Sequence, residues 1–323
     1  MIIEILILLI SFIIFAYIGD YLVLALEFIS HRLKIPETVV GATFAAIGSS
    51  APEFGTSLFS VIEKHPDVGL GTIIGSAIFN ILVIIGLSAV FQKMMKGKNR
   101  KLDKKVLWRD ALFYFVATIF LFLFISDGAV TRIEAIALLL VYGIYVGVMY
   151  IDSRRGNGKI IELPEEHNMT SKKAIIYVIG GVLIIFAATH FMVNAIISLA
   201  PNIGLSEVVL SLIIVAAGTS IPDLFVSIAA AKRGRMGMAV SNAIGSNTFD
   251  ILVCLGFPLA TQQSTEVIGD IGLSMLFLIA SLILIIFMIL HKWHISKKEG
   301  IILFSLYIIY AIFVFGGFSW LIP

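Results

Sequence analysis

Long apolar runs separated by short polar segments occupy almost the whole chain. An α-helix needs about 20 apolar residues to cross a bilayer, and ten runs are long enough. The apolar positions within each run are continuous rather than alternating, which predicts helices and excludes the strands of a membrane β-barrel. The predicted spans are 3–29, 37–62, 68–91, 107–126, 129–151, 173–199, 206–231, 237–261, 267–291 and 300–321.

Composition agrees with this pattern. Of the 323 residues, 59% are hydrophobic and only 14% are charged, which excludes a soluble globular domain. The first run continues into Asp20 and Glu27 without a small-residue cleavage site, so it is interpreted as a span and not as a signal peptide. The single cysteine, Cys254, lies in an apolar run, so no intrachain disulfide is possible.

The positive charges test the count of ten spans. With ten spans both termini lie on one side of the membrane, and the loops after spans 1, 3, 5, 7 and 9 lie on the other. Of the 23 Lys and Arg residues, only Lys64 and Arg132 fall outside those loops and their flanks. Because Lys and Arg concentrate in cytoplasmic loops, we predict a multi-pass protein of the cell membrane with both termini extracellular.

The chain divides into two halves of five spans. Residues 1–151 and 173–323 are separated by the polar segment 152–172, which is too short for a sensor domain and is predicted to be a cytoplasmic linker. Because each half has an odd number of spans, the halves enter the membrane from opposite sides. The predicted fold is an all-α membrane protein of ten transmembrane helices, arranged as two inverted five-helix repeats.

Both halves carry one polar motif inside an apolar run. Gly48-Ser-Ser-Ala-Pro-Glu53 lies in span 2 and Gly218-Thr-Ser-Ile-Pro-Asp223 in span 7, at an offset of 218 − 48 = 170 residues. Proline has no N–H and interrupts the helical hydrogen bonds one turn earlier, so helices 2 and 7 are predicted to be broken. A carboxylate at mid-membrane is costly without partners, so the motif indicates a functional site in the core.

A second motif repeats at the same offset. Gly75-Ser-Ala-Ile-Phe-Asn80 in span 3 matches Gly245-Ser-Asn-Thr-Phe-Asp250 in span 8. The pseudo-two-fold axis of an inverted repeat brings spans 2, 3, 7 and 8 together at mid-depth, so we expect one polar cluster. Its expected members are Glu53, Asn80, Asp223 and Asp250, surrounded by Ser49, Ser50, Ser76, Thr219, Ser220, Ser246 and Asn247.

The donors of this cluster are almost all oxygen atoms. We expect neither His nor Cys among them, which argues against zinc, copper and iron and favours Ca²⁺, Na⁺ or K⁺. An ion pair of purely structural role for Glu53 needs a basic partner at the same depth, and these four spans offer none. Asn80 has the alternative of bridging two helices. Glycines of the same spans are interpreted as close-packing positions: Gly75, Gly86, Gly245 and Gly256.

Charge limits what such a cluster can hold. Three ionised carboxylates carry a charge of about −3, and one Ca²⁺ leaves a residual charge of −1 that needs a second cation or a proton. Ca²⁺ with K⁺, several Na⁺ ions, or Ca²⁺ with one protonated carboxyl all satisfy this requirement. Mutually exclusive occupancy by Ca²⁺ or by Na⁺ is what an antiporter needs.

Other membrane residues are interpreted as structural. Asp20 and His190 occupy matching positions in spans 1 and 6, and a hydrogen bond that fixes these helices is preferred over a gate or proton relay. Spans 4, 5, 9 and 10 are rich in Phe and Ile and are predicted to be lipid-facing scaffold.

The two motifs resemble the α-repeats of the calcium/cation antiporter superfamily, and within it the sodium/calcium exchangers. The resemblance covers about 37–90 and 207–260 strongly. Three segments resemble the potassium-dependent branch, in a prokaryotic form: Ser50-Ala-Pro-Glu53, Ser220-Ile-Pro-Asp223 and Asn247-Thr-Phe-Asp250. The chain departs from the animal relatives in its short central loop, so no large Ca²⁺-sensing domain is expected.

The resemblance implies which residues hold the cations. The side chains of Glu53, Asp223, Asn80 and Asp250 would be ligands, and Asp250 is the residue that the potassium-dependent branch ties to K⁺. It also implies that spans 1 and 6 slide across a rigid core. Hydroxyl and carbonyl ligands would come from Ser49, Ser50, Ser76, Thr219, Ser220 and Ser246, and from the backbone of Ala46 and Ala216.

We therefore expect a secondary antiporter, not an enzyme, that extrudes Ca²⁺ against inward Na⁺ by alternating access, with K⁺ co-transport left open. Ca²⁺/H⁺ exchange is the alternative, since carboxylates also carry protons. A cation channel is disfavoured because channel filters usually come from several subunits around an axis. An intramembrane enzyme would need a nucleophile–base pair or a metal-binding His that the core lacks. The expected partners are the transported cations and the lipid bilayer, with no nucleic acid and no obligatory protein partner.

Overall fold

The computed structural model describes residues 1–33, 46–92, 104–155, 169–232, 234, 236–266, 271–292 and 294–316, and nearly all of them are helical. The first half forms α1 (Ile2–Arg32), α3 (Ala46–Ser49), α4 (Ala51–Ile62), α5 (Pro66–Phe79), the π-helical segment η2 (Asn80–Ile85), α6 (Gly86–Phe91), α7 (Lys104–Ile125) and α8 (Arg132–Arg155). The second half forms α9 (Ser171–Asn202), α10 (Glu207–Leu210), the π-helical segment η4 (Ser211–Val215), α11 (Ala216–Thr219), α12 (Ile221–Lys232), α13 (Met236–Phe249), the π-helical segment η5 (Asp250–Leu255), α14 (Gly256–Ala260), α15 (Gly272–Lys292) and α16 (Lys297–Phe315).

The helices account for the ten predicted spans. Among the described residues, eight helices are long and apolar enough to cross a membrane. The pair Glu207–Thr219 and Ile221–Lys232 forms a ninth, bent by 48° at its break. The tenth is predicted span 2, of which α3 and α4 are described, while residues 37–45 lie outside the described part. The ten-helix, two-repeat architecture is thus the one that the sequence predicts.

The breaks in helices 2 and 7 lie where the two prolines predict them. Ser50 separates α3 from α4, and Ser220 separates α11 from α12. Pro52 and Pro222 each occupy the second position of the following helix, where a missing N–H costs nothing. The helices restart with the amides of Phe54 and Leu224, which donate to the carbonyls of the two break serines at 2.9 and 3.1 Å.

A π-helical turn follows each second motif. η2 begins at Asn80 and η5 begins at Asp250, at the same position of the two repeats. Such turns are rare and are frequent at functional sites. In both repeats the wider turn begins at the last residue of the second motif.

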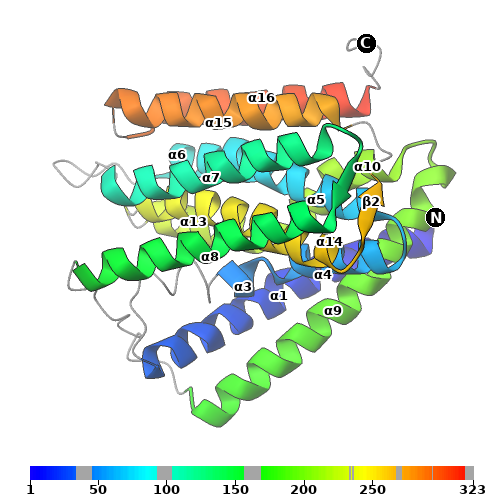
Figure 1. Cartoon of the computed structure of the whole chain (residues 1–323), viewed down its shortest axis with the longest axis horizontal. Coiled ribbons are helices and arrows are strands. Elements are labelled where there is room, and N and C mark those ends of the chain that lie inside the picture. The colour runs from blue at the N-terminus through cyan, green and yellow to red at the C-terminus, as the bar shows by residue number, and fades with distance from the viewer. Residues whose placement is uncertain are drawn as a thin grey trace.

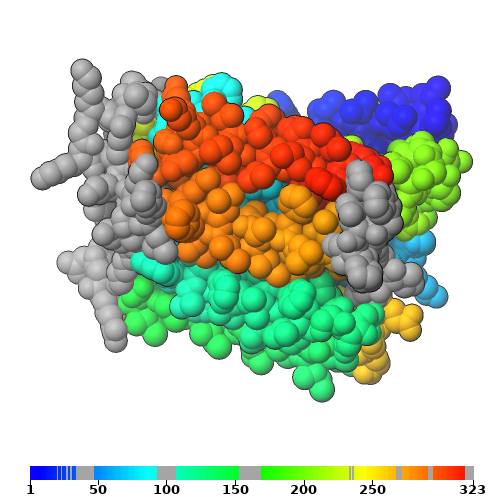
Figure 2. Space-filling view, turned by 90° about the horizontal axis from the view of Figure 1, so that it is seen from above, coloured from blue at the N-terminus to red at the C-terminus, as the bar shows by residue number. Residues whose placement is uncertain are grey.

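The two largest hydrophobic cores of the described residues occupy different parts of the molecule. The larger one joins α5, η2, α13 and η5 to α7, α8, α15 and α16. The smaller one lies chiefly between α1 and α9, where Phe15 and Leu22 pack with Ile185 and Met192. In Figure 1, α1 and α9 form one flank of the molecule and α15 and α16 form the opposite flank. Figure 2 shows α16, α15 and α7 side by side on that opposite surface.

Glycines let helices from opposite repeats approach closely. A Cβ at Gly75 would overlap the Leu212 carbonyl oxygen. A Cβ at Gly86 would lie 3.0 Å from the Gly300 carbonyl, and one at Gly256 would lie 3.2 Å from the Cβ of Leu138. The packing role predicted for these three glycines is confirmed. Gly245 has no described atom within 4 Å, so its predicted packing role is not found among the described residues.

A short strand pair was not predicted. β1 (Ala129–Thr131) and β2 (Ser264–Glu266) pair antiparallel and join the loop after α7 to the loop after α14. Arg132 secures this ribbon, because its guanidinium donates to the carbonyls of Thr261 and Gln262 at 3.2 and 3.1 Å. The ribbon ties the two repeats together at the side of the membrane predicted to be extracellular.

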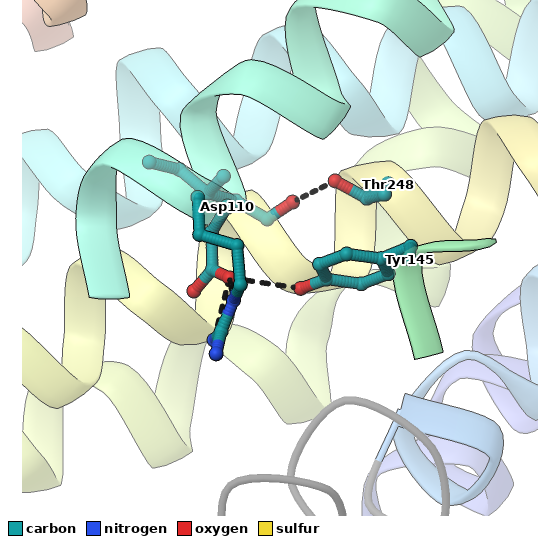
Figure 3. A network of polar contacts seen from close by, with 5 residues as sticks. Asp110, Tyr145 and Thr248 are labelled. Atoms are coloured by element: carbon teal, nitrogen blue, oxygen red, sulfur yellow. Dashed lines mark hydrogen bonds and ion pairs between the residues drawn. The ribbon is translucent and has the colours of Figure 1, made fainter. Parts of the chain in front are cut away.

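Many apolar side chains of α7 and α8 are exposed, in line with the predicted lipid-facing scaffold, but α7 also carries a buried polar network that was not predicted. Asp110 of α7 is buried and accepts hydrogen bonds from Arg109 at 2.9 Å and from the Tyr145 hydroxyl of α8 at 3.1 Å. In Figure 3 Thr248 of α13 lies beside this network. The aspartate was overlooked because it follows a basic segment in the sequence, where it looks like part of a solvated loop.

Candidate cation site

The two broken helices and the two π turns bring the four predicted ligands into the core. Glu53 and Asp223 lie in the first turns of α4 and α12, where helix dipoles favour negative charge. Asn80 and Asp250 are the first residues of η2 and η5. All four side chains are between 0% and 3% exposed. Glu53 lies close enough to both Asp223 and Asp250 to interact electrostatically with each carboxylate.

Hydroxyl groups connect the repeats at this point. The Ser76 and Ser220 hydroxyl oxygens are 2.8 Å apart, and the Ser220 hydroxyl donates to Glu53 Oε1 at 3.3 Å. Ser76 also lies beside the Asp250 carboxylate, so the two hydroxyls connect Glu53 to Asp250. This chain of hydrogen bonds passes from the first repeat to the second and back, as the inverted-repeat arrangement predicts.

An amide pair fixes the orientation of Asn80. Its Nδ2 donates to Asn247 Oδ1 at 2.8 Å, and Asn247 Nδ2 donates to the Ala77 carbonyl at 3.1 Å. The predicted alternative for Asn80, a hydrogen bond between helices, is therefore present. The bridge between helices uses Asn80 Nδ2 and leaves Asn80 Oδ1 without a hydrogen-bond partner. Asn80 can therefore bridge the helices through one atom and bind a cation through the other.

Four buried oxygen atoms in this region have no hydrogen-bond partner. They are Ser50 Oγ, Glu53 Oε2, Asn80 Oδ1 and Asp250 Oδ2. Buried polar atoms are nearly always paired, so several unpaired oxygens in one region need an explanation. Carboxylate, amide and hydroxyl oxygens are the donors that hard cations such as Ca²⁺ prefer. The residues present fit such an ion.

The remaining predicted donors surround the carboxylates. Thr219 lies beside Glu53. Ser49 and Ser246 lie beside Asp223, while Ser50 and Ser76 lie beside Asp250. Within the described residues no three His, Cys, Asp or Glu side chains are close enough to hold one metal ion together. A cation here would therefore be held by carboxylates together with neutral oxygen donors.

The two predicted carbonyl ligands differ in what the structure shows. The Ala216 carbonyl accepts the Ser220 amide at 3.2 Å and the Thr219 hydroxyl at 3.3 Å, so its lone pairs are engaged. Ala46 begins α3, directly after the residues that the structure does not describe. Ligation by either carbonyl stays a prediction.

The expectation that no cysteine joins the cluster was wrong. The Cys254 thiol donates to Asp250 Oδ1 at 3.5 Å and lies 3.8 Å from the Ser50 carbonyl oxygen. Cys254 follows Asp250 by four residues, the spacing that places two side chains on one helix face. This signal was present in the sequence.

The pair Asp20 and His190 is tested only in part. His190 Nδ1 lies 3.5 Å from Glu63 Oε1 at the end of α4, and its ring packs against Phe59 with centroids 5.2 Å apart. The Asp20 side chain lies outside the described part of the structure. His190 thus contacts helix 2 of the core, while the hydrogen bond predicted to fix spans 1 and 6 stays a prediction.

Comparison with known protein families decides the class of protein. Residues 3–151 and 173–316 match the sodium/calcium exchanger protein family. The chain belongs to this family. Its members are exchangers, so the chain is a multi-pass membrane transport protein and not a member of an enzyme family.

Relatives of the exchanger come from all domains of life. An uncharacterized membrane protein of Methanocaldococcus jannaschii is 32% identical over 93% of this chain and 94% of its own length. The inner membrane protein YrbG of Escherichia coli is 28% identical over 91% of this chain and 90% of its own length. Sodium/potassium/calcium exchanger 1 of Mus musculus is 45% identical, but over 40% of this chain and 11% of its own length.

Solved structures of the sodium-calcium exchanger NCX_Mj share the fold of this exchanger. A structure soaked with Na⁺ and Sr²⁺ covers 95% of this chain and 97% of its own, with a TM-score of 0.64 and 29% identity. One soaked with Na⁺ and Ca²⁺ covers 96% of this chain and 97% of its own, with a TM-score of 0.64 and 28% identity. The likeness extends over both repeats and confirms the predicted fold class.

Proposed function

We propose that this protein is a secondary antiporter that exchanges Na⁺ for Ca²⁺ by alternating access, and that K⁺ moves together with Ca²⁺. The observation that carries the proposal is the set of four unpaired buried oxygens, two of which belong to the carboxylates of Glu53 and Asp250, near the third carboxylate, Asp223. Such a dry cluster is stable only when cations or protons compensate its charge. Ligands from both repeats meet there, so one site can serve both sides of the membrane.

The transported ions follow from donor chemistry and from the relatives. Oxygen donors suit Na⁺, K⁺ and Ca²⁺. Two groups of relatives are named as exchangers of sodium and calcium. Two arguments favour K⁺ as a further ion. The relative that is 45% identical over 130 residues is named as a sodium/potassium/calcium exchanger. In addition, one Ca²⁺ bound to three carboxylates would leave a charge of about −1. K⁺ would neutralise that residual charge, and Asp250 is the ligand that we assign to it.

The separate core between α1 and α9 supports a moving unit. These helices contact the broken helices directly: a Cβ at Gly55 would lie 2.5 Å from Thr189 Oγ1, and one at Gly19 would lie 3.5 Å from Pro222 Cγ. A Cβ at Gly218 would overlap the ring of Phe12. These close contacts couple α1 and α9 to the broken helices, and a shift of α1 and α9 would leave the larger core intact. We propose that this shift opens the cluster to one side at a time.

The proposal also covers the division of the chain into two repeats and its orientation in the membrane. We assign residues 1–151 and 173–323 to the two repeats, residues 152–172 to a cytoplasmic linker, and both termini to the extracellular side of the cell membrane. The distribution of Lys and Arg supports this orientation. Cysteines introduced one at a time near either terminus, tested with a membrane-impermeant thiol reagent on intact cells, would check it.

Flux into proteoliposomes with Na⁺, K⁺ and H⁺ gradients imposed separately tests the function. We expect ⁴⁵Ca²⁺ uptake driven by an outward Na⁺ gradient, and loss of this uptake in Glu53→Gln and in Asp223→Asn. Full flux in both variants would remove the cluster from the mechanism. Uptake driven by a pH gradient without Na⁺ would favour Ca²⁺/H⁺ exchange, and single-channel currents would favour a channel.

A further inference from the structure

Asn242 of α13 contacts one of the three clustered carboxylates, although it lies outside both sequence motifs. Its Nδ2 atom donates to Asp223 Oδ1 at 3.2 Å and to Ser227 Oγ at 3.2 Å. Asp223 and Ser227 are one turn apart on α12, so a single amide group bridges α13 to one face of α12. Asn242 and Ser246 are likewise one turn apart on α13, and Ser246 also lies beside Asp223.

Where the structure describes the first repeat, it shows no such bridge. Thr72 occupies the position of Asn242, and its hydroxyl donates to the Val68 carbonyl of its own helix at 2.7 Å. Ser57 occupies the position of Ser227, and its hydroxyl oxygen has no partner. Glu53 instead accepts the Ser220 hydroxyl from the other repeat. The two halves therefore hold their carboxylates by different means.

This difference matches the pattern of unpaired oxygens. Glu53 and Asp250 each have one buried carboxylate oxygen without a partner, whereas Asp223 Oδ1 accepts the Asn242 amide. Asn242 supplies one of the donors to Asp223, and the rest of that carboxylate faces Ser49 and Ser246. The Asp223 side chain is thus fixed before a cation arrives, while Glu53 and Asp250 keep open coordination positions.

We propose that Asn242 is a positioning residue that holds the Asp223 carboxylate in the geometry needed for cation binding, an inference that rests on the proposed function. A ligand that is already oriented loses less conformational freedom when the cation binds. Partners that orient metal ligands typically contribute 10- to 100-fold to metal affinity. Asn242 acts through Asp223 and is not itself assigned as a ligand.

The test compares Asn242→Leu with Thr72→Val. Leucine has nearly the shape of asparagine but no donor, and Thr72→Val removes a buried hydroxyl at the matching position of the other repeat. For Asn242→Leu we expect the KM for Ca²⁺ in Na⁺-driven flux to rise about 10-fold or more, with a much smaller change in maximal rate. For Thr72→Val we expect the KM of the wild type. An unchanged KM in Asn242→Leu, or an equal rise in both variants, would overturn the proposal.

Binding measured without transport separates this inference from the proposed function. The detergent-purified proteins are unfolded thermally while Na⁺ or Ca²⁺ is titrated, and the midpoint of the cation-induced rise in melting temperature gives an apparent affinity. We expect about a tenfold weaker midpoint for Asn242→Leu, with little change in the melting temperature without cation. A lower melting temperature with an unchanged midpoint would show a merely structural role. If the wild type binds cations but shows no exchange, the proposed function is refuted. The difference in apparent cation affinity between Asn242→Leu and the wild type would still test the role of Asn242.

Discussion

The Ser76 hydroxyl lies 2.8 Å from the Ser220 hydroxyl, and these two serines come from opposite repeats. Their counterparts by the internal repeat, Ser246 and Ser50, do not reproduce the contact: Ser246 lies beside Asp223, and Ser50 Oγ has no partner. The backbone repeats itself, but the hydrogen bonds at the cluster do not. Because of this asymmetry, the Ser76 and Ser220 hydroxyls are hydrogen-bonded to each other, while the Ser50 hydroxyl oxygen stays available to a cation.

Ser220→Ala should weaken cation binding. The change removes a hydroxyl that we expect to be a ligand and that also orients Glu53 Oε1. Groups that orient metal ligands typically contribute 10- to 100-fold to metal affinity, so the KM for Ca²⁺ should rise about 10- to 100-fold in vesicle flux. Ser60→Ala is the matched control, because Ser60 is a buried serine on α4 whose hydroxyl bonds only the Ser57 carbonyl, at 2.8 Å. Equal effects of the two changes would contradict a role for Ser220 in the cluster.

Asp250→Asn should separate K⁺ from Na⁺ and Ca²⁺. The amide keeps the shape of the carboxylate and removes its charge, so the residual charge of about −1 that K⁺ would neutralise disappears. We expect K⁺ to stimulate Na⁺-driven ⁴⁵Ca²⁺ uptake in the wild type and to have no effect in the variant. If K⁺ stimulates both equally, the assignment of Asp250 is wrong. If it stimulates neither, the protein exchanges Na⁺ for Ca²⁺ alone.

Gly75→Ala should destabilise the contact between repeats. The added methyl would overlap the Leu212 carbonyl oxygen and lie 2.7 Å from the Cβ of Ala216, and backbone atoms cannot move aside cheaply. Overpacking of this kind costs about 1–3 kcal/mol, so the melting temperature in detergent should fall. Gly143→Ala on α8 is the control: the residue is exposed, and no described atom lies within 4 Å of the added methyl. Its melting temperature should stay the same or rise.

Asp110→Ala should lower stability without changing the affinity for cations. Arg109 has only 11% of its side chain exposed, and loss of a buried partner leaves its charge uncompensated, at a cost of about 3–5 kcal/mol. Tyr145→Phe removes one hydrogen bond and should cost about 1 kcal/mol. The melting temperature should therefore fall more for Asp110→Ala than for Tyr145→Phe. In both variants the KM of the folded protein for Ca²⁺ should equal that of the wild type. A raised KM would connect this network to the cluster.

The sequence alone was sufficient for the features that depend on the internal repeat. The offset of 170 residues paired the two broken helices, and the two prolines located both breaks. Opposite insertion of the halves then predicted that Glu53 and Asp223 meet in the core, which the structure bears out. These features were predictable because a carboxylate within an apolar run has few acceptable surroundings.

Other features could not be predicted, or were overlooked, for identifiable reasons. Cys254 was missed although its spacing from Asp250 is helical, because a thiol in an apolar run looks like core. Asn242 lies outside both motifs, and only the packing of α13 on α12 shows its partner. The β1–β2 ribbon consists of two three-residue strands in loops, too short for an alternating pattern. The Asn242 contact and the ribbon depend on tertiary structure that local sequence does not encode.

The π turns at η2 and η5 show how far the internal repeat extends. Fewer than about 1 in 100 residues of known proteins adopt this conformation, yet it begins at Asn80 and again 170 residues later at Asp250. The repeat therefore preserves a rare backbone conformation as well as the sequence motif. Each half presents the last side chain of its second motif from the start of a widened turn.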